Sequence, residues 1–327
     1  MKKLYRFPQK HIMLSVPLIL VLGFIIGSFV DTSFLRPTIL IATMVMIYAT
    51  MVGLDFNELK SLKGSKTLFI SIIINFIIIP FVAYGIGMTF LKERPIMFAG
   101  LALSALLPTS GMTISWTMLQ RGNVTLAVKL TIFGLLLGSL LAPWYLLLMV
   151  GQFIDINIWA TVRTILLIVF IPMILGQITY KLILRKTSVK HFKKHIKPNF
   201  APLSVWGMLY VVFVSISMRA KMIVSNLELI LIALIVLIVF YGINYLISTT
   251  VAVKWLNRED GIALVNGTVL RNLSISIGLA ATTFGAEAAL IVTLAFIVQQ
   301  QSITYYSRIS EKFWFKEEKQ HTWKEAL

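Results

Sequence analysis

Long apolar runs fill most of the chain, and short polar stretches separate them. Because a helix needs about 20 predominantly apolar residues to cross a bilayer, each run of that length predicts a membrane span. The pattern predicts an all-α membrane protein with ten transmembrane helices. The expected spans are His11–Val30, Arg36–Leu54, Lys66–Leu91, Ile96–Gln120, Val124–Val150, Ala160–Leu184, Pro202–Met218, Glu228–Leu256, Gly261–Phe284 and Glu287–Ser307.

Two of these spans contain residues that interrupt a helix. In the fourth span, Pro108 and Gly111 enclose Thr109 and Ser110. Proline removes a backbone hydrogen bond and clashes with the preceding turn, and glycine weakens a helix further. A polar stretch, Asn266–Asn272, interrupts the ninth span. Backbone groups bared inside a membrane must be buried by protein or line a polar cavity, so both interruptions indicate a binding site.

The two interruptions occupy matching places in two halves of the chain. The fourth of each five spans is broken, which is the pattern of an inverted-topology repeat. We expect residues 1–184 to contain the five spans of the first repeat, with the broken helix at 96–120, and the start of the second repeat near residue 160. Residues 185–199 are expected to form a basic cytoplasmic linker. Residues 200–327 would hold the rest of the second repeat and a cytoplasmic tail.

Composition agrees with a membrane protein and narrows the chemistry. Hydrophobic residues make up 58% of the chain and charged residues 13%, against about 25% charged residues in a typical soluble domain. The chain has no cysteine, which excludes disulfides, thiolate metal sites and cysteine nucleophiles. The four histidines lie near span ends or in a basic loop, so no metal cluster is predicted and no cofactor is expected.

The net charge of +17 indicates a lipid surface rather than nucleic acid, because the basic residues lie in loops and tails. With the N-terminus inside, basic residues are concentrated in the inner segments 1–10, 60–66, 181–197, 254–258 and 308–324. The outer segments hold only Arg36, Lys92, Arg94, Arg219 and Lys221. The positive-inside rule therefore predicts a multi-pass protein of the cell membrane with both termini cytoplasmic.

Arg271 is the basic residue that lies in the middle of a predicted span, inside the second interruption. A buried cation there costs several kcal/mol unless it is paired or hydrated. Its own span offers no carboxylate partner. Three interpretations follow: an anionic substrate, a fixed charge that stands in for a bound cation, or hydrogen bonds to carbonyl groups of a neighbouring helix.

Other polar residues cluster at the same two interruptions. Asn75 lies alone in an apolar stretch, where it is either part of the site or an interhelical hydrogen bond worth about 0.6–2 kcal/mol. Neither interruption carries the nucleophile, base and orienting group that catalysis needs, so no enzyme is expected. The candidate solute- or ion-binding residues are Asn75, Pro108, Thr109, Ser110, Gly111, Thr113, Thr131, Asn266, Gly267, Thr268, Arg271 and Asn272.

Three short motifs occur in a characteristic order. They are N-F-x-x-x-P at Asn75–Pro80, Pro108 followed by Arg121-Gly122-Asn123, and Arg271-Asn272 before Phe284-Gly285. In these motifs the chain resembles the superfamily of bile acid:sodium symporters and arsenite-efflux permeases. The resemblance implies a panel domain and a core domain, with the broken fourth and ninth helices crossing in the core, and transport by alternating access.

The resemblance also bears on the transported species. It leaves Asn75, Thr113 and Thr131 as residual oxygen ligands for sodium. However, Ile114, Ala127, Gly267 and Arg271 replace the asparagine, serine, glutamate and glutamine expected of a sodium-coupled carrier, which argues against sodium coupling. Gly111 stands where arsenite permeases carry a cysteine, so thiolate capture of As(III) or Sb(III) is excluded.

The hypothesis that fits these features is a secondary active transporter of a small organic anion or oxyanion. The alternative is an arsenite or antimonite efflux permease that exchanges its substrate for protons, and a membrane sensor without transport is less favoured. The expected partners are the lipid bilayer, a small-molecule solute, and H⁺ or Na⁺ as the coupling ion, with no nucleic acid. Substrate identity, direction of transport and oligomeric state stay open.

Overall fold

The computed structural model describes residues 2–53, 64–109, 111–154, 156–218, 220–221 and 227–316, and within these ranges it is helical with no sheet. Six segments are long and apolar enough to cross a membrane: Ser65–Phe90, Val124–Val150, Trp159–Leu184, Val189–Ser217, Glu228–Trp255 and Ala286–Phe313. Four shorter apolar helices accompany them: Leu14–Phe29, Thr38–Met51, Pro95–Leu106 and Leu273–Phe284. The prediction of an all-helical membrane protein is confirmed.

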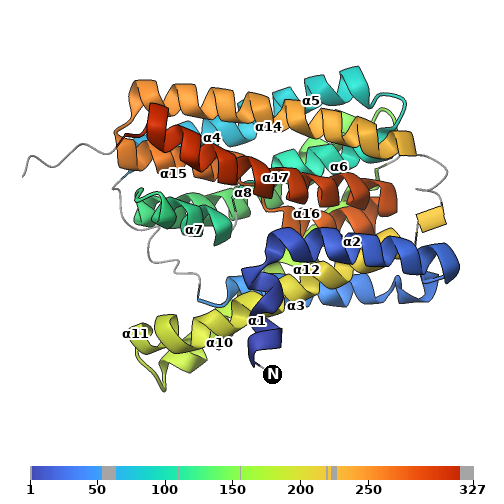
Figure 1. Ribbon diagram of the computed structural model, residues 1–327, viewed down its shortest axis with the longest axis horizontal. Helices are drawn as coiled ribbons and strands as arrows, with labels where there is room; N and C mark the ends of the chain where they lie inside the picture. The colour runs from blue at the N-terminus through green and yellow to red at the C-terminus, as the bar shows by residue number, and fades with distance from the viewer. Residues whose placement is uncertain are drawn as a thin grey trace, which may run out of the picture.

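The order of the helices along the chain can be followed in Figure 1. Their bounds are α1 Lys2–Lys10, α2 Ile12–Phe29, α3 Thr38–Met51, α4 Ser65–Ile73, α5 Ile79–Phe90, α6 Pro95–Leu106, α7 Gly111–Leu119, α8 Val124–Val150, α9 Ile158–Ile165, α10 Ile171–Leu184, α11 Val189–His191, α12 Phe200–Ser217, α14 Leu227–Trp255, α15 Arg258–Val269, α16 Leu273–Leu279 and α17 Ala286–Phe313. Turns of π-helix at Ile74–Ile78 and Leu166–Phe170 join α4 to α5 and α9 to α10, and a third, Ala280–Phe284, extends α16.

Asparagine residues start several of these helices. Asn123, Asn157, Asn257 and Asn272 each accept a hydrogen bond from the backbone N–H three residues later, at the first turns of α8, α9, α15 and α16. A side-chain oxygen at this position satisfies one of the N–H groups that a helix start leaves without a partner, which stabilises the helix by roughly 1 kcal/mol. The sequence therefore marks helix starts inside a largely apolar chain.

The helices form two groups (Figure 1). In one group, α12 packs against α2 and α3, and α3 also packs against α10. In the other, α6 packs against α5, α8 and α17. Helices α14 and α15 pack against each other; α14 also packs against α17, and α15 against α7. The two groups meet where α3 and α12 contact α16 and α17.

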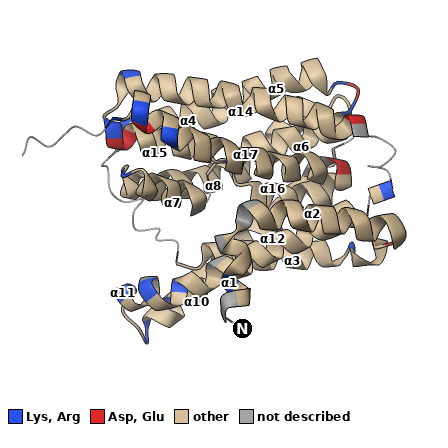
Figure 2. Ribbon diagram, viewed as in Figure 1, with Lys and Arg blue, Asp and Glu red and all other residues tan. Residues whose placement is uncertain are grey.

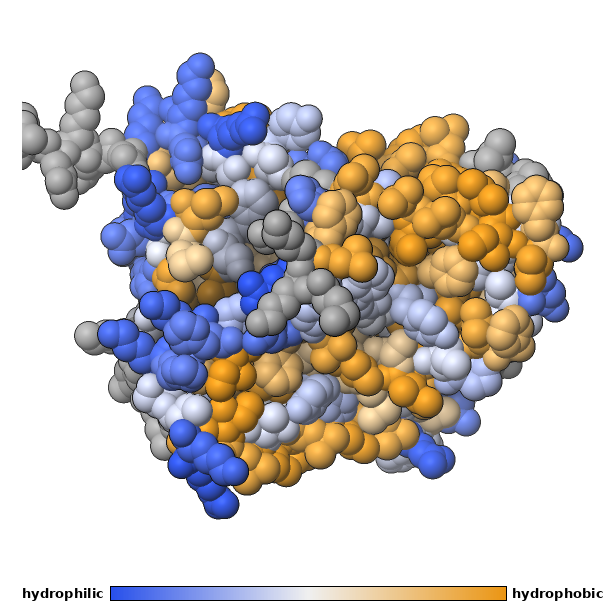
Figure 3. Space-filling view, turned by 60° about the horizontal axis from the view of Figure 1, so that its bottom comes forward, coloured by the Kyte–Doolittle hydropathy of each residue, from blue (hydrophilic) through white to orange (hydrophobic). Residues whose placement is uncertain are grey.

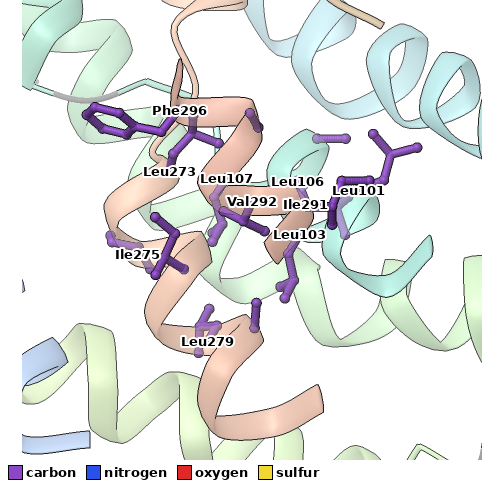
Figure 4. Close-up of a cluster of buried hydrophobic side chains, with 14 of the residues drawn as sticks. Leu101, Leu103, Leu106, Leu107, Leu273, Ile275, Leu279, Ile291, Val292 and Phe296 are labelled. Carbon is purple, nitrogen blue, oxygen red and sulfur yellow. The ribbon is translucent and has the colours of Figure 1, made fainter. Parts of the chain in front are cut away.

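A continuous apolar cluster runs through both helix groups, and Figure 4 shows part of it. The side chains labelled there come from α6, α16 and α17, and from Leu107 in the connection after α6. Its labelled members are Leu101, Leu103, Leu106, Leu107, Leu273, Ile275, Leu279, Ile291, Val292 and Phe296, all of them buried.

The outside of the bundle is strongly apolar. Phe29, Phe81, Leu148 and Trp159 are 73–83% exposed, as expected of side chains that face lipid. Lys and Arg gather at one end of the helices, on the left of Figure 2, near the ends of α10, α14 and α15. Hydrophilic residues lie at the same end in the space-filling view, and apolar residues cover much of the remaining visible surface (Figure 3).

Two expectations about local structure need correction or qualification. The second interruption is narrower than predicted: α15 continues to Val269, and Leu270 still donates its N–H to the Asn266 carbonyl at 3.2 Å. Gly267 did not break this helix, because a single glycine in a packed helix costs only about 1 kcal/mol relative to alanine. The candidate Ser110 and the tail residues 317–327 lie outside the described residues.

A glycine allows α6 to contact α17 closely, and this contact can be tested. A Cβ atom added at Gly100 would lie 2.5 Å from the Ala288 carbonyl oxygen and 2.4 Å from the Ile291 Cγ2 atom. We expect Gly100→Ala to destabilise the protein by about 1–3 kcal/mol, because the backbone of α17 must shift. The measurement is thermal unfolding in detergent.

Gly85→Ala is the matched control, since a Cβ atom at Gly85 in α5 meets nothing within 4 Å. It should leave the melting temperature unchanged or raise it slightly, because alanine favours a helix over glycine. Equal melting temperatures for the two variants would contradict the packing described for α6 and α17.

Candidate functional site: the meeting point of two broken helices

The two interrupted helices meet in the interior of the second helix group. One interruption separates α6 from α7, and the other separates α15 from α16. Pro108 and Arg271 pair as a single antiparallel β-bridge, and Asn272 donates its N–H to the Leu107 carbonyl at 2.8 Å. The two breaks thus satisfy part of each other's exposed backbone, as burial requires.

Thr109 has an unusual backbone conformation within the first interruption. Its φ is 60°, in the left-handed region, and its side chain is fully buried. A β-branched residue in that conformation costs roughly 1–3 kcal/mol, so the surroundings must hold it there. Its hydroxyl lies 2.7 Å from the Pro108 carbonyl oxygen and within 3.4 Å of the Leu130 and Thr131 carbonyl oxygens of α8.

Two glycines of α8 make this contact possible. A Cβ atom at Gly134 would lie 2.6 Å from the Thr109 hydroxyl oxygen, and one at Gly138 would lie 2.8 Å from the Leu106 carbonyl oxygen. Because neither position carries a side chain, the backbone of α8 lies directly against the first interruption. The strained turn is therefore supported by a rigid helix.

Arg271 has the largest fully buried side chain in the part of the chain that the structure describes, at 1% exposed. Its Nε donates to the Ser104 carbonyl at 3.1 Å, and its Nη2 donates to the Ala105 carbonyl. Its Nη1 donates to the Thr268 carbonyl at 2.9 Å and to Asn75 Oδ1 at 2.5 Å. A guanidinium group has five N–H donors, and these four hydrogen bonds use most of them.

The carbonyl acceptors share one electrostatic property. Ser104 and Ala105 lie in the last turn of α6, and Thr268 lies in the last turn of α15. A helix C-terminus carries about half a negative charge, so two such ends supply about one negative charge around the guanidinium. This is the physical reason that a cation is stable here without a carboxylate.

Asn75 reaches the guanidinium from a π-helical turn between α4 and α5. Its Oδ1 accepts from Arg271, and its Nδ2 donates to the Gly267 carbonyl at 3.1 Å and to the Ser71 hydroxyl at 3.1 Å. A π-turn inserts an extra residue into a helix and occurs frequently at functional sites. Asn75 therefore joins a third helix to the two broken ones.

Gln299 of α17 completes the bonding of the Arg271 backbone. Its Oε1 accepts from the Arg271 N–H at 2.7 Å and from the Tyr241 hydroxyl at 3.0 Å, and its Nε2 donates to the Arg271 carbonyl at 3.4 Å. A tract of three glutamines, 299–301, signals this position in the sequence. Tyr241 of α14 has no such signal, because it lies in an ordinary apolar span.

A second polar cluster lies between α7 and α15. Asn266 Nδ2 donates to the Thr117 hydroxyl at 3.2 Å and to Gln120 Oε1 at 3.5 Å, and the Thr113 hydroxyl donates to the Asn266 carbonyl at 3.3 Å. Gln120 Nε2 and Asn266 Oδ1 are buried and have no partner among the described residues. Buried polar atoms without a partner are rare in folded proteins, so these two atoms are candidates for bonding to a solute. Sequence analysis missed Thr117 and Gln120, although the spacing 113, 117, 120 places them on one helix face.

The remaining candidates lie close by but have separate roles in the structure. The Thr131 hydroxyl bonds to the Ala127 carbonyl in its own helix at 2.8 Å. The Thr268 hydroxyl bonds to the Ser248 hydroxyl of α14 at 2.7 Å. Gly111 begins α7, and Asn272 caps α16.

The interior of the described structure is cationic. Lys129 of α8 is 2% exposed and Arg271 is 1% exposed, whereas none of the aspartates and glutamates whose burial is described is buried. Acidic residues lie at helix ends instead: Glu228 pairs with Arg94 at 2.9 Å, and Asp260 accepts from Asn123 at 2.8 Å. No group of three His, Cys, Asp or Glu residues suited to a metal occurs among the described residues.

Comparison with known proteins identifies the family. The model of the Sodium Bile acid symporter family matches residues 38–226, which is more than half of the 327 residues. The chain belongs to this family. It is a multi-pass membrane transporter of the family, and the resemblance in its motifs is confirmed.

Individual relatives of this transporter are distant. It is 22% identical to the uncharacterized protein YbaS of Bacillus subtilis (strain 168) over 272 residues, 82% of this chain and 87% of YbaS. It is 20% identical to the arsenical-resistance protein Acr3 of Corynebacterium glutamicum over 307 residues, 86% of this chain and 82% of that protein. An Acr3 of Alkaliphilus metalliredigens is 24% identical over 204 residues, 58% of this chain and 56% of the relative.

The bonding of Asn75 in this transporter can be tested against a second buried asparagine. Asn75→Leu leaves the N–H groups of Arg271 with one acceptor fewer, so we expect a loss of about 1–3 kcal/mol in stability. Asn244 of α14 is the control, because its Nδ2 and Oδ1 have no partner among the described residues. Asn244→Leu should be neutral or stabilising in the same thermal unfolding assay. A reversed order of the two variants would contradict the hydrogen bonds assigned to Asn75.

Proposed function

We propose that the chain is a secondary active transporter that moves a small organic anion or oxyanion by alternating access. Its ten spans would form two inverted five-span repeats. The second repeat would begin near residue 160, and residues 185–199 would form the basic cytoplasmic linker. The six long apolar segments and the shorter apolar helices beside them support this topology. In this proposal, one of the two helix groups would act as the scaffold and the other as the moving unit of alternating access.

The proposed orientation places both termini in the cytoplasm. Among the described residues, Lys and Arg gather at the end of the bundle that holds the ends of α10, α14 and α15 (Figure 2). Cytoplasmic segments of membrane proteins carry an excess of these residues. The proposal therefore assigns that end to the cytoplasmic side.

The observation that carries the anion proposal is the charge balance at the meeting point. Two helix C-termini, of α6 and α15, and two helix N-terminal ends, of α7 and α16, converge there. The two C-termini together carry about −1, which balances the Arg271 guanidinium bonded to them. The two N-terminal ends together carry about +1, so the meeting point keeps a net positive charge. Sites of one sign of charge attract solutes of the other sign.

Arg271 acts in this proposal through its charge rather than through direct contact with the solute. Most of its N–H donors bond to protein oxygens, so they are not available to a ligand in this conformation. The unpartnered Gln120 Nε2 is a better donor to a bound oxygen atom. The proposed solute contacts are thus the cluster of Thr113, Gln120 and Asn266 together with the two interruptions.

Two measurements test the anion proposal. Thermal unfolding of the purified protein is first recorded with small carboxylates, sulfate, phosphate and uncharged analogues, since a ligand that binds the folded state raises its stability. Uptake of the stabilising anion is then measured in proteoliposomes, with empty liposomes as the baseline. We expect an anion both to stabilise the protein and to be taken up. Equal uptake of charged and uncharged analogues would contradict the proposal.

Gln120 allows the solute contact to be tested directly. Gln120→Leu removes a buried donor, so the KM for the transported anion should rise about tenfold, the change that corresponds to 1.4 kcal/mol. Gln301→Leu is the control, because the Gln301 side chain is exposed on α17. An unchanged KM in Gln120→Leu would remove this residue from the site.

The second candidate function is efflux of arsenite or antimonite, exchanged for protons. It is favoured by the similarity to two proteins named arsenical-resistance protein Acr3. The absence of cysteine means that a neutral trihydroxide would have to bind through hydroxyl and amide groups. Expression in a bacterial strain without its own arsenite exporter tests this alternative. Unrelieved arsenite sensitivity, with the protein verified in the membrane, would exclude it.

A further inference from the structure

Four oxygen atoms accept hydrogen bonds from the Arg271 guanidinium. Carbonyl groups of Ser104, Ala105 and Thr268 and the amide oxygen of Asn75 surround the guanidinium, each within hydrogen-bonding distance of one of its nitrogen atoms. All four belong to buried residues. In membrane carriers, carbonyls at the ends of broken helices are the groups that coordinate Na⁺. The donor set is therefore of the kind that binds a monovalent cation.

The name of the family implies that its members bind sodium, but the residues around Arg271 do not suit a bound sodium ion. Each of the four oxygens already accepts a hydrogen bond from the guanidinium. The two helix ends supply about one negative charge, which the guanidinium neutralises. A sodium ion added to the same oxygens would place a second positive charge beside the first, in a buried setting where like charges repel strongly.

We propose that Arg271 is a tethered cation, which fills a latent sodium site and makes the transporter independent of sodium at this position. The guanidinium is covalently attached, so its positive charge is always present at these oxygens. A sodium ion would supply that charge only while it is bound. Transport would then proceed without Na⁺ binding here as a step of the cycle. This consequence for transport rests on the proposed function, whereas the identity of the site does not.

The test is to remove the tethered charge and ask whether sodium binds in its place. Arg271→Gln removes the guanidinium and leaves the four oxygens, and its own amide oxygen can act as a fifth. Thermal unfolding is measured in NaCl and in N-methyl-D-glucamine chloride at equal ionic strength. The wild-type protein should melt at the same temperature in both salts. We expect Arg271→Gln to melt about 2–4 °C higher in sodium at ten times its dissociation constant.

Two further variants locate the effect. Arg271→Gln combined with Asn75→Leu removes one of the oxygens and should lose the sodium response. Lys129→Gln removes the other basic side chain that is buried among the described residues, without opening these oxygens, so it should gain no sodium response. A sodium response of equal size in Lys129→Gln would mean that loss of buried charge alone produces the effect, and it would overturn the proposal.

Saturable binding of ²²Na⁺ to the wild-type protein gives a result that does not depend on folding of the variants. Binding that Asn75→Leu abolishes would overturn the proposal, because it would show that sodium and the guanidinium share the oxygens. A folded Arg271→Gln that does not respond to sodium would also overturn it. If Arg271→Gln folds only when sodium is present during purification, the proposal is supported. If the sodium responses are as expected but no anion is taken up, the proposed function is refuted and the proposal for Arg271 still holds.

Discussion

The structure depends on one cation held by the ends of two helices. The guanidinium of Arg271 bonds to carbonyl groups in the last turns of α6 and α15, which are the groups that a broken helix leaves without partners. Without such a donor, the interrupted helices would expose bare carbonyls at membrane depth, where each costs several kcal/mol. The helix breaks and the buried charge therefore depend on each other. The exposed carbonyl groups stabilise the guanidinium, and the guanidinium supplies the hydrogen-bond donors that these carbonyl groups need.

The elements around this contact serve to fix its position. Gly134 and Gly138 bring α8 against the first interruption, the π-turn brings Asn75 to the guanidinium, and Gln299 bonds both backbone groups of Arg271. The polar cluster at Asn266 and Gln120 lies beside this fixed core, with unpartnered buried atoms. The structure thus combines an extensively hydrogen-bonded centre with a neighbouring cluster whose buried polar atoms lack partners, and a bound solute could form hydrogen bonds in that cluster.

Helical spans and the first interruption could be predicted because they depend on local properties: run length, proline and glycine. The second interruption was predicted too wide, since Asn266 and Gly267 are held in helix by packing against α7 and α8 that the local sequence does not encode. The position of Arg271 was evident from sequence, but its acceptors were not. They are backbone carbonyls, which every residue possesses, so no residue type marks them. Tyr241 was missed for a related reason, because its role depends on facing Gln299.

The sequence separation of the Arg271 contacts has a consequence for biogenesis. Asn75, Ser104 and Ala105 precede Arg271 in the chain by 196, 167 and 166 residues. During synthesis these acceptors enter the membrane first, and the arginine emerges from the ribosome last. The guanidinium therefore gains its hydrogen bonds to Asn75, Ser104 and Ala105 only when its span docks onto helices made earlier, whereas its bond to Thr268 can form within its own span.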